Sequence, residues 1–350
     1  MDRFIGLDAH ASSCTLGVVS PSGKRVGSHV VETNARCLIE AVRQVSEPRH
    51  ICLEEGTLSE WLHEVLSPHA ERVVVTTVQA SRGPKDDRRD AFGLADSLRL
   101  GAIDRAVYKE RGGFGALGYR ARGYRWIRDD VVRVKNRLKS VYRSRGVQVA
   151  GPSVYTASKR GAFLERLPRP AQPLAELLYA ELDALEALKR EAQDAMLAEA
   201  KRHPVVKSCP GLGPVRAAQL LPIVVTPYRF RSKRGFWAYC GLGIVTRSSS
   251  DWVRSRTGEW VKAEVKRTRG LNRNSNHTLK AIFKGAATTV IGRAEDEPIY
   301  RHYLRLLDGG TKPNLAKLTI ARQIASIVLA VWRTAEVYDP KRLEKTSKSG

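Results

Sequence analysis

The sequence predicts an α/β domain at the N-terminus, followed by a long helical hairpin or coiled coil and a mostly α-helical C-terminal domain. Short apolar strands alternate with amphipathic helices over the first hundred residues. Two later stretches, 121–145 and 173–201, carry apolar residues at the three- and four-residue spacing of long helices. Charge separates the same regions: residues 1–100 contain 12 Lys/Arg and 14 Asp/Glu, a net charge of −2, so the other 250 residues carry +26.

Breaks in composition mark the domain boundaries. At 350 residues the chain is long enough for two or three domains. Residues 101–117 are rich in glycine and are interpreted as a linker. The expected organisation is an α/β domain (1–105), a linker with a helical or coiled-coil region (106–202), a C-terminal domain (203–340) and a disordered tail (341–350).

The composition favours a polyanionic partner. A formal net charge of +24 makes nucleic acid the best candidate. A membrane surface fits less well, because no basic stretch is paired with a long apolar face, and the apolar run from Ile324 to Trp332 is too short to span a bilayer. The N-terminus has no signal-peptide pattern. Five scattered cysteines without a CxxC pair indicate a reducing cytoplasm and argue against structural zinc or disulfides.

The elements of the first domain imply a mixed sheet with helices on its faces. Three strands form a meander, and helices and strands then alternate. Asn34 is placed to cap the first helix. The expected elements are strands over 2–8, 13–20 and 25–32, a helix from 35 to about 45, a strand over 50–54, a helix over 58–66, a strand over 72–78 and a helix that opens near 88.

Four carboxylates are expected to meet at one edge of this sheet. Asp8 ends the first strand and Glu54 ends the fourth, and strand ends near a change in strand order gather the chemistry of such sheets. Asp87 and Asp90 lie on one face of the following helix. Capping alone would explain these two acids equally well, and a solvated strand end would explain Glu54. Together, carboxylates from three segments predict a site for Mg²⁺, with Mn²⁺ as the alternative, suited to phosphoryl transfer.

The order of these acids resembles the RuvC-like branch of the ribonuclease-H fold. The run from Lys85 to Ala91 (KDDRRDA) is similar to the insertion-sequence transposases of the 110 family, recombinases with a DEDD carboxylate set that are guided by a bridge RNA. In that family a small residue and then Thr-Gly usually follow the glutamate. Here residues 54–57 read EEGT, so Glu54 matches best and Glu55 stays as the alternative. Asp86, next to Asp87, leaves a smaller ambiguity.

Two long helices are expected after the linker, with a Gly/Ser/Pro break over 146–170. Two interpretations are open: a local antiparallel hairpin, or an intermolecular coiled coil that builds a dimer. The resemblance implies oligomerisation and RNA contact, with a basic surface against phosphates; otherwise this surface is a solvated basic face. The apolar seams are Ile127, Val131, Val134, Leu138 and Val141 on the first helix, and Leu174, Leu178, Leu182, Leu185 and Leu188 on the second. The basic residues are Lys135, Arg137, Lys139 and Arg143.

Residues 208–218 (SCPGLGPVRAA) place a Pro-Gly-x-Gly turn before an Ala/Leu-rich helix. This pattern resembles the turn of helix-hairpin-helix DNA binders, although any tight turn between helices can have it. Gly211 and Gly213 would allow the backbone to approach a phosphate, and the helix start with Arg216 would favour an anion. In the resembling family such a turn opens the C-terminal transposase domain.

A loop of three serines follows Gly241-Leu242. In the resembling family a Gly-Leu leads through a short spacer to a Ser-Gly whose serine attacks DNA. Counting from this dipeptide places Ser249 at the nucleophile position, with Ser248 and Ser250 as alternatives, since the next residue is not glycine. A serine hydroxyl is a weak nucleophile and requires a polarised phosphate. Without the resemblance, this stretch would be a polar loop.

A strongly basic stretch follows and predicts a phosphate-tracking surface whose binding weakens steeply with salt. A helix is expected from near His277, and two apolar helices over about 295–307 and 314–334 are expected to pack on the C-terminal domain. The residues expected to contact nucleic acid in this part of the chain are Arg247, Lys262, Lys266, Arg267, Arg269 and Arg273.

The residues and the resemblance together predict a DNA transposase or recombinase of the bacterial cytoplasm and nucleoid. By implication of the family, Ser249 forms a covalent phosphoserine link, and the carboxylates hold Mg²⁺ in a composite site built from different domains or subunits. The expected partners are double-stranded DNA at the element ends and target, a bridge RNA, and further copies of the chain in a dimer or tetramer. Two rivals are a Holliday-junction nuclease that uses water, and a non-catalytic RNA- or DNA-binding scaffold.

Overall fold

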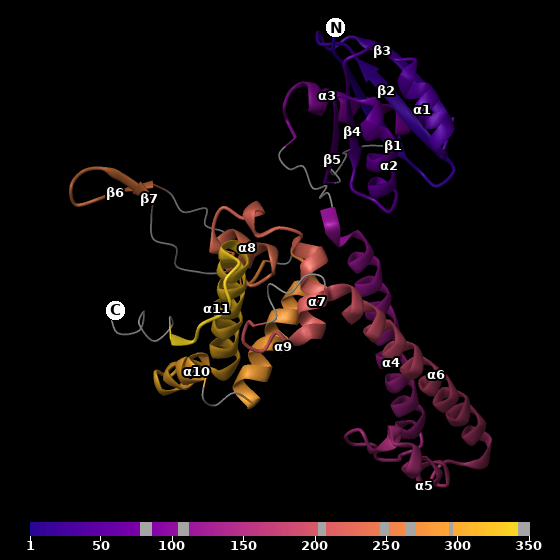
Figure 1. Ribbon diagram of the computed structural model, residues 1–350, viewed down its shortest axis with the longest axis vertical. Helices are drawn as coiled ribbons and strands as arrows, with labels where there is room; N and C mark the ends of the chain where they lie inside the picture. Colours follow the sequence, from indigo (N-terminus) through magenta and orange to yellow (C-terminus); the bar gives the residue numbers. More distant parts are fainter. Residues whose placement is uncertain are drawn as a thin grey trace. The chain divides into compact units, whose positions relative to one another are not determined.

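The computed structural model describes residues 1–77, 86–103, 112–201, 208–245, 252–262, 270–272, 274–293 and 297–341 (Figure 1). The chain divides into two compact units, Met1–Glu110 and Arg111–Gly350. Their described cores are built from different residues, so each unit is presented by itself.

The N-terminal unit contains a five-stranded mixed sheet with the strand order β3-β2-β1-β4-β5. The first three strands form an antiparallel meander, and β4 and β5 extend the sheet in parallel from β1. The predicted mixed sheet is confirmed, and its last strand is shorter than expected. The strands are β1 (Arg3–Ala9), β2 (Ser13–Val19), β3 (Arg25–Glu32), β4 (Arg49–Glu54) and β5 (Arg72–Thr76).

Helices cover both faces of this sheet. Two of them pack on the face that includes Ile5 and Leu7, and the third packs on the opposite face through Leu94 and Leu98. The Asn34 side chain caps the first helix, as predicted, by accepting a hydrogen bond from the Cys37 backbone N–H at 2.8 Å. The helices are α1 (Ala35–Arg43), α2 (Ser59–Leu66) and α3 (Asp87–Arg99).

The second unit begins with an antiparallel helical pair, α4 (Gly115–Arg143) and α6 (Gln172–Ala200). The local hairpin is therefore formed, and the short helix α5 (Arg160–Leu164) lies in the connection at its far end. The far end has its own core, in which the Tyr142 and Tyr179 hydroxyls lie 3.0 Å apart.

The expected seam on α6 is partly wrong. Leu178 and Leu182 are buried against α4, but Leu174 is 52% exposed and Leu188 is 49% exposed. The buried face of α6 is formed by Ala175 and the residues at helical spacing from it. Leu174 and Leu188 therefore lie outside the contact with α4. Apolar spacing indicated the helix correctly but not the centre of its buried face.

The near end of the helical pair packs into a larger core formed by the C-terminal helices. Ile324 and Val328 of α11 are completely buried in this core. By length and composition α11 is apolar enough to cross a membrane, which the expected apolar run of nine residues did not suggest. Its packing against α9 and α8 accounts for the apolar character, and the expected packing of the last two helices is confirmed. The helices are α7 (Gly213–Val224), α8 (Lys233–Tyr239), α9 (His277–Arg293), α10 (Pro298–Asp308) and α11 (Pro313–Thr334).

A two-stranded hairpin, β6 (Trp252–Arg254) and β7 (Trp260–Lys262), was not predicted. Gly258, with φ of +83°, turns the chain between the strands.

Candidate functional site

Parallel pairing places the first two predicted carboxylates at one sheet edge. Leu7 of β1 pairs with Leu53 of β4, so Asp8 and Glu54 follow side by side at the carboxyl ends of neighbouring strands. In mixed sheets this edge gathers the loops that carry chemistry. Glu54 is half-buried and its neighbour Glu55 is exposed, and both line the same cleft.

The other two predicted carboxylates come from the first turn of α3. Asp86 caps this helix by accepting a hydrogen bond from the Arg88 backbone N–H at 3.0 Å. Since Asp86 has this structural role, Asp87 and Asp90 are the acids that the first turn presents to the cleft.

Gly6 determines how closely α3 approaches the sheet. A Cβ atom added at Gly6 would lie 1.8 Å from the Ala91 carbonyl oxygen, well inside any allowed contact. Only glycine permits this approach. Because position 6 has no side chain, the first turn of α3, with Asp87 and Asp90, can lie close to the end of β1 that carries Asp8.

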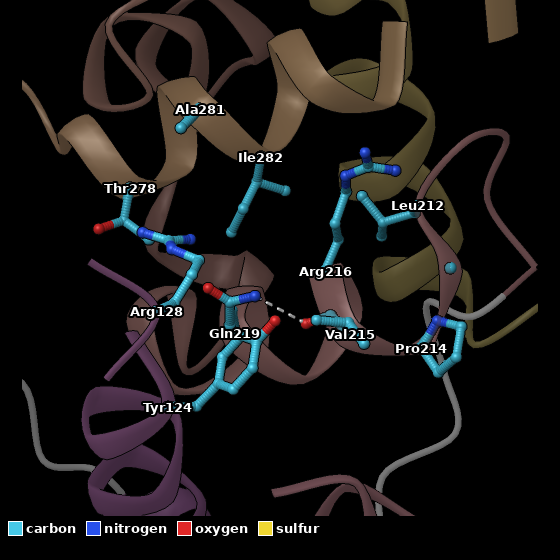
Figure 2. A pocket seen from close by; sticks show the side chains of 11 residues that line it. Tyr124, Arg128, Leu212, Pro214, Val215, Arg216, Gln219, Thr278, Ala281 and Ile282 are labelled. Carbon is cyan, nitrogen blue, oxygen red and sulfur yellow. Dashed lines mark hydrogen bonds between the residues drawn. The ribbon is translucent and has the colours of Figure 1, made fainter. Parts of the chain in front are cut away.

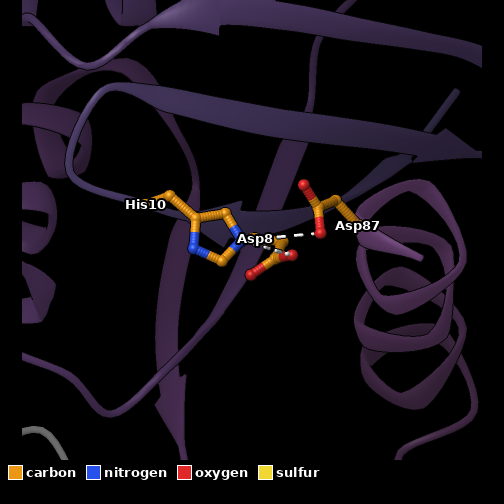
Figure 3. A group of neighbouring side chains, drawn as sticks. All are labelled: Asp8, His10 and Asp87. Atoms are coloured by element: carbon orange, nitrogen blue, oxygen red, sulfur yellow. Dashed lines mark ion pairs between the residues drawn. The ribbon is translucent and has the colours of Figure 1, made fainter. Parts of the chain in front are cut away.

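The three closest metal-binding side chains at this edge are Asp8, His10 and Asp87. The His10 Nε2 atom lies 3.4 Å from Asp8 Oδ2 and 3.5 Å from Asp87 Oδ1. Figure 3 shows the three side chains with these ion pairs as dashed lines. One potential ligand atom from each residue lies within 4.8 Å of the others. The surrounding cleft, of about 620 Å³, is also lined by Glu54 and Asp90, so all four predicted carboxylates share it.

Like charges crowd this cleft. Partial burial raises the pKa of the Asp8 carboxyl; the neighbouring His10 opposes this shift, and the charges of Asp87 and Asp90 add to it. A bound cation stabilises carboxylates that lie close together, and oxygen ligands suit Mg²⁺ and Mn²⁺. The chemistry of this set of ligands therefore fits a hard divalent cation.

His10 was missed from the sequence. It lies two residues after Asp8, in the turn between β1 and β2. A histidine so close to a predicted ligand was a usable signal, because imidazole both binds metals and exchanges protons near neutral pH.

A second candidate region surrounds the start of α7. A cavity of about 420 Å³ lies between α4, α7 and α9, and Figure 2 shows the side chains around it. Gln219 is 4% exposed and donates a hydrogen bond to the Val215 carbonyl at 3.1 Å, while its Oε1 atom is buried with no partner among the described residues. Arg128 and Arg216 add positive charge to the wall.

The predicted residues of this turn have different roles. A Cβ atom at Gly211 would lie 2.3 Å from the Ala286 carbonyl oxygen, so this glycine is required for packing on α9. Gly213 is exposed with open space around it, which leaves its backbone accessible. Arg216 Nη1 donates to the Gly211 carbonyl at 2.7 Å and to Thr289 Oγ1 at 3.0 Å, and burial lowers its pKa.

The predicted basic residues of α4 are largely paired within the hairpin. Lys135 Nζ lies 2.6 Å from Glu186 Oε1, and Arg137 Nη1 lies 3.8 Å from Glu181 Oε1 on α6. The Lys139 ammonium lies 5.4 Å from the centre of the Tyr155 ring. Arg143, the last residue of α4, is exposed.

The serine loop lies outside the described residues. The longer segment that contains it and the β6–β7 hairpin starts and ends at residues that lie side by side. Ile244 and Leu271 form an antiparallel bridge, and the Asn272 N–H donates to the Gly243 carbonyl at 3.1 Å. Leu242 is fully buried, and its carbonyl accepts a hydrogen bond from Arg322 at 2.7 Å. The predicted residues outside the description are Arg247, Ser248, Ser249, Ser250, Lys266, Arg267, Arg269 and Arg273, and for Lys262 only the backbone is described.

Part of the C-terminal unit matches a known protein family. Residues 203–304 match the profile described as Transposase IS116/IS110/IS902 family. The match covers α7, α8, the β6–β7 hairpin, α9 and the start of α10. No curated protein matches the chain.

Proposed function

Because the chain belongs to the IS116/IS110/IS902 transposase family through residues 203–304, we propose that it is a DNA transposase that joins carboxylate chemistry to a serine nucleophile. The observation that carries this proposal is the cleft in which all four predicted carboxylates of the N-terminal unit meet. The five-stranded mixed sheet with helices on both faces is consistent with a RuvC-like domain.

The N-terminal unit supplies the metal-binding residues in this proposal. Asp8, Glu54, Asp87 and Asp90 hold Mg²⁺ or Mn²⁺, and His10 orients Asp8 and Asp87 through its contacts with both. Bound divalent cations withdraw charge from a phosphoryl group during its transfer.

The C-terminal unit supplies the nucleophile. The Ser249 Oγ atom forms a bond to a DNA phosphorus as the bond from phosphorus to the 3′ oxygen breaks. The serine loses its proton to solvent, and the departing 3′ oxygen takes one up, so the strand ends as a free 3′ hydroxyl and a phosphoserine. Ser248 and Ser250 are the alternatives at this position.

The remaining assignments follow from this activity. The partners are double-stranded DNA at element ends and target, a bridge RNA that supplies sequence recognition by base pairing, and further copies of the chain. Residues for contact with the nucleic-acid backbone are the exposed Arg143 at the end of α4, the exposed Gly213 in the turn before α7, and the basic residues between Arg247 and Arg273. The compartment is the bacterial cytoplasm.

A covalent-trapping experiment tests the proposal. The protein is purified with its bound RNA, incubated with Mg²⁺ and end-labelled DNA that spans an element junction, denatured, and separated on a gel. Labelled protein is expected, and it disappears in both Ser249→Ala and Asp87→Asn. Glu40→Gln, on α1, is the matched control and retains the adduct.

The alternative results are informative. An adduct that survives Ser249→Ala but not Ser248→Ala or Ser250→Ala moves the nucleophile by one residue. Cleaved DNA without any adduct identifies a nuclease that uses water. An unchanged adduct in Asp87→Asn contradicts the carboxylate site. Wild-type protein that binds the DNA but gives neither cleavage nor adduct supports a scaffold.

A further inference from the structure

The β6–β7 hairpin presents two tryptophans to solvent. Trp252 is 61% exposed and Trp260 is 62% exposed, although indole is among the side chains that gain most from burial. In the described part of the chain neither ring belongs to a hydrophobic core. A patch of exposed aromatic groups on one short hairpin is a feature typical of partner-binding surfaces.

Strand register places the two indoles on one face. Trp252 pairs with position 262 and Arg254 pairs with Trp260, and paired residues of antiparallel strands share a face. The Arg254 guanidinium lies 5.5 Å from the centre of the Trp260 ring. Val253 and Val261 therefore occupy the opposite face. One face thus alternates aromatic rings with positive charge, and the other is aliphatic.

The turn holds the hairpin in shape without a core beneath it. The Ser255 N–H donates to the Glu259 carbonyl at 2.8 Å, and Ser255 Oγ accepts from the Thr257 and Glu259 N–H groups at 3.2 Å. An isolated two-stranded hairpin is marginally stable in water, so packing against a partner would stabilise it further. The face is preformed for a ligand.

The chemistry of the face selects among partners. Residues 252–262 contain three basic side chains and one acidic one, in a chain of net charge +24, which favours a polyanion over a second copy of this chain. Indole rings offer no hydrogen-bond code for paired bases in a groove, but they stack on the faces of unpaired bases, and arginine neutralises the adjacent phosphate.

We infer that the Trp252–Arg254–Trp260 face binds unpaired DNA bases. The inference of DNA rests on the proposed function, because Trp252 follows the predicted nucleophile Ser249 by three residues in the chain. A strand that is cut and rejoined must be separated locally from its complement. Stacking on the two indoles would hold such a strand open.

Binding measurements with the full chain test this inference. The probes are a labelled 20-nucleotide single-stranded DNA, the same sequence as a duplex, and the same sequence as RNA. Replacing both tryptophans (Trp252→Ala, Trp260→Ala) is expected to weaken single-stranded DNA binding at least tenfold while duplex binding changes less than twofold. The matched control (Val253→Ala, Val261→Ala) alters the other face of the same strands and is expected to bind like wild type.

Four results would overturn the inference. They are equal losses of affinity for duplex and single-stranded DNA, a loss of affinity confined to RNA, the same loss in the valine control, or unchanged affinity together with a smaller oligomer in size-exclusion chromatography. The proposed function is tested separately by the covalent adduct. Weakened single-strand binding in the tryptophan variant, without any adduct in wild type, supports the inference and contradicts the proposed serine chemistry. An intact adduct with unchanged single-strand binding supports the proposed chemistry and contradicts the inference.

Discussion

The carboxylate cleft and the helical pair arrange charge in opposite ways. In the cleft, Asp8 and Asp87 contact the same His10. Burial raises the pKa of Asp8, His10 opposes this shift, and the charges of Asp87 and Asp90 add to it. In the helical pair, Lys135 on α4 lies 2.6 Å from Glu186 on α6. Unlike charges there hold two helices together, whereas like charges in the cleft oppose one another. A charge arrangement that costs stability is retained where a ligand compensates for it.

The largest effect is expected when the close approach of α3 to Gly6 of β1, which builds the cleft, is removed. Gly6→Ala places a Cβ atom 1.8 Å from the Ala91 carbonyl oxygen and must displace α3. We expect a loss of about 3 kcal/mol or more in the free energy of unfolding, measured with urea, together with loss of the covalent adduct. Gly93→Ala is the control, because a Cβ there meets nothing within 4 Å; it should be neutral or stabilise α3 by about 0.5–1 kcal/mol. Equal stability of Gly6→Ala and wild type would show that α3 is not held by this contact.

The second test concerns metal. If the like charges await a cation, Mg²⁺ at a hundredfold excess over its dissociation constant should stabilise the wild-type protein by about 2.7 kcal/mol. Asp87→Asn should lose most of this gain and, without metal, should be as stable as wild type or slightly more so, because it removes repulsion. Thermal unfolding with and without Mg²⁺ measures both effects. Glu40→Gln, an exposed residue paired with Arg36 on α1, should respond to Mg²⁺ like wild type.

Part of this cleft could be predicted from the sequence, for physical reasons. Asp8 and Glu54 end apolar strands, and the parallel pairing of such strands places their ends together. His10 and the approach of α3 at Gly6 depend on a turn and on a single backbone contact, and neither leaves a periodic signal in the sequence. The residue types were therefore predictable, but the distances between them were not.

The helical pair shows a different limit. Its two helices followed from apolar spacing, yet Leu174 lies outside the interface, because a stripe about half a helix wide is compatible with several rotations. Spacing also cannot show which basic residues pair within the fold. Lys135 was expected to face phosphates, and the structure places Glu186 against it. The β6–β7 hairpin escaped prediction because three-residue strands are too short to show alternation.

The third test asks whether Lys135 is structural. Lys135→Met should reduce the free energy of unfolding by about 1 kcal/mol, since among the described residues it leaves Glu186 with Lys189 alone as a partner. Its affinity for single-stranded or duplex DNA should change less than twofold. Arg143→Met, at the exposed end of the same helix, is the comparison for binding. A DNA defect in Lys135→Met without a stability defect would reverse the assignment.

The pH dependence of the same pair adds a fourth test. Burial alone would raise the pKa of Glu186, but hydrogen bonds from Lys135 and Lys189 outweigh it and hold the pKa below its ordinary value. The pair therefore stabilises the fold above the pKa of the unfolded chain and loses this contribution as pH falls through the lower, folded-state pKa. The stability difference between wild type and Glu186→Gln should be full at neutral pH and shrink in acid. A difference that is constant from neutral to acidic pH would mean that the charge of Glu186 contributes nothing.

The last test concerns Gln219, a buried polar group with no charge. Its Oε1 atom is buried without a hydrogen-bond partner among the described residues, beside a cavity that Arg128 and Arg216 also line. A buried acceptor left without a donor costs stability, so Gln219→Met should raise the free energy of unfolding by about 1 kcal/mol. Ala217→Ser, a buried position on the same helix outside this cavity, should lower it. In the cleft, an arrangement that costs stability is retained because a ligand compensates for it. If the same holds for Gln219, then Gln219→Met should stabilise the protein and also weaken binding of a ligand that donates a hydrogen bond to Oε1. Titration of wild type and Gln219→Met with the same single-stranded DNA measures this difference in binding. A variant that is more stable and binds equally well would show that ligand compensation applies only to the charged groups of the cleft.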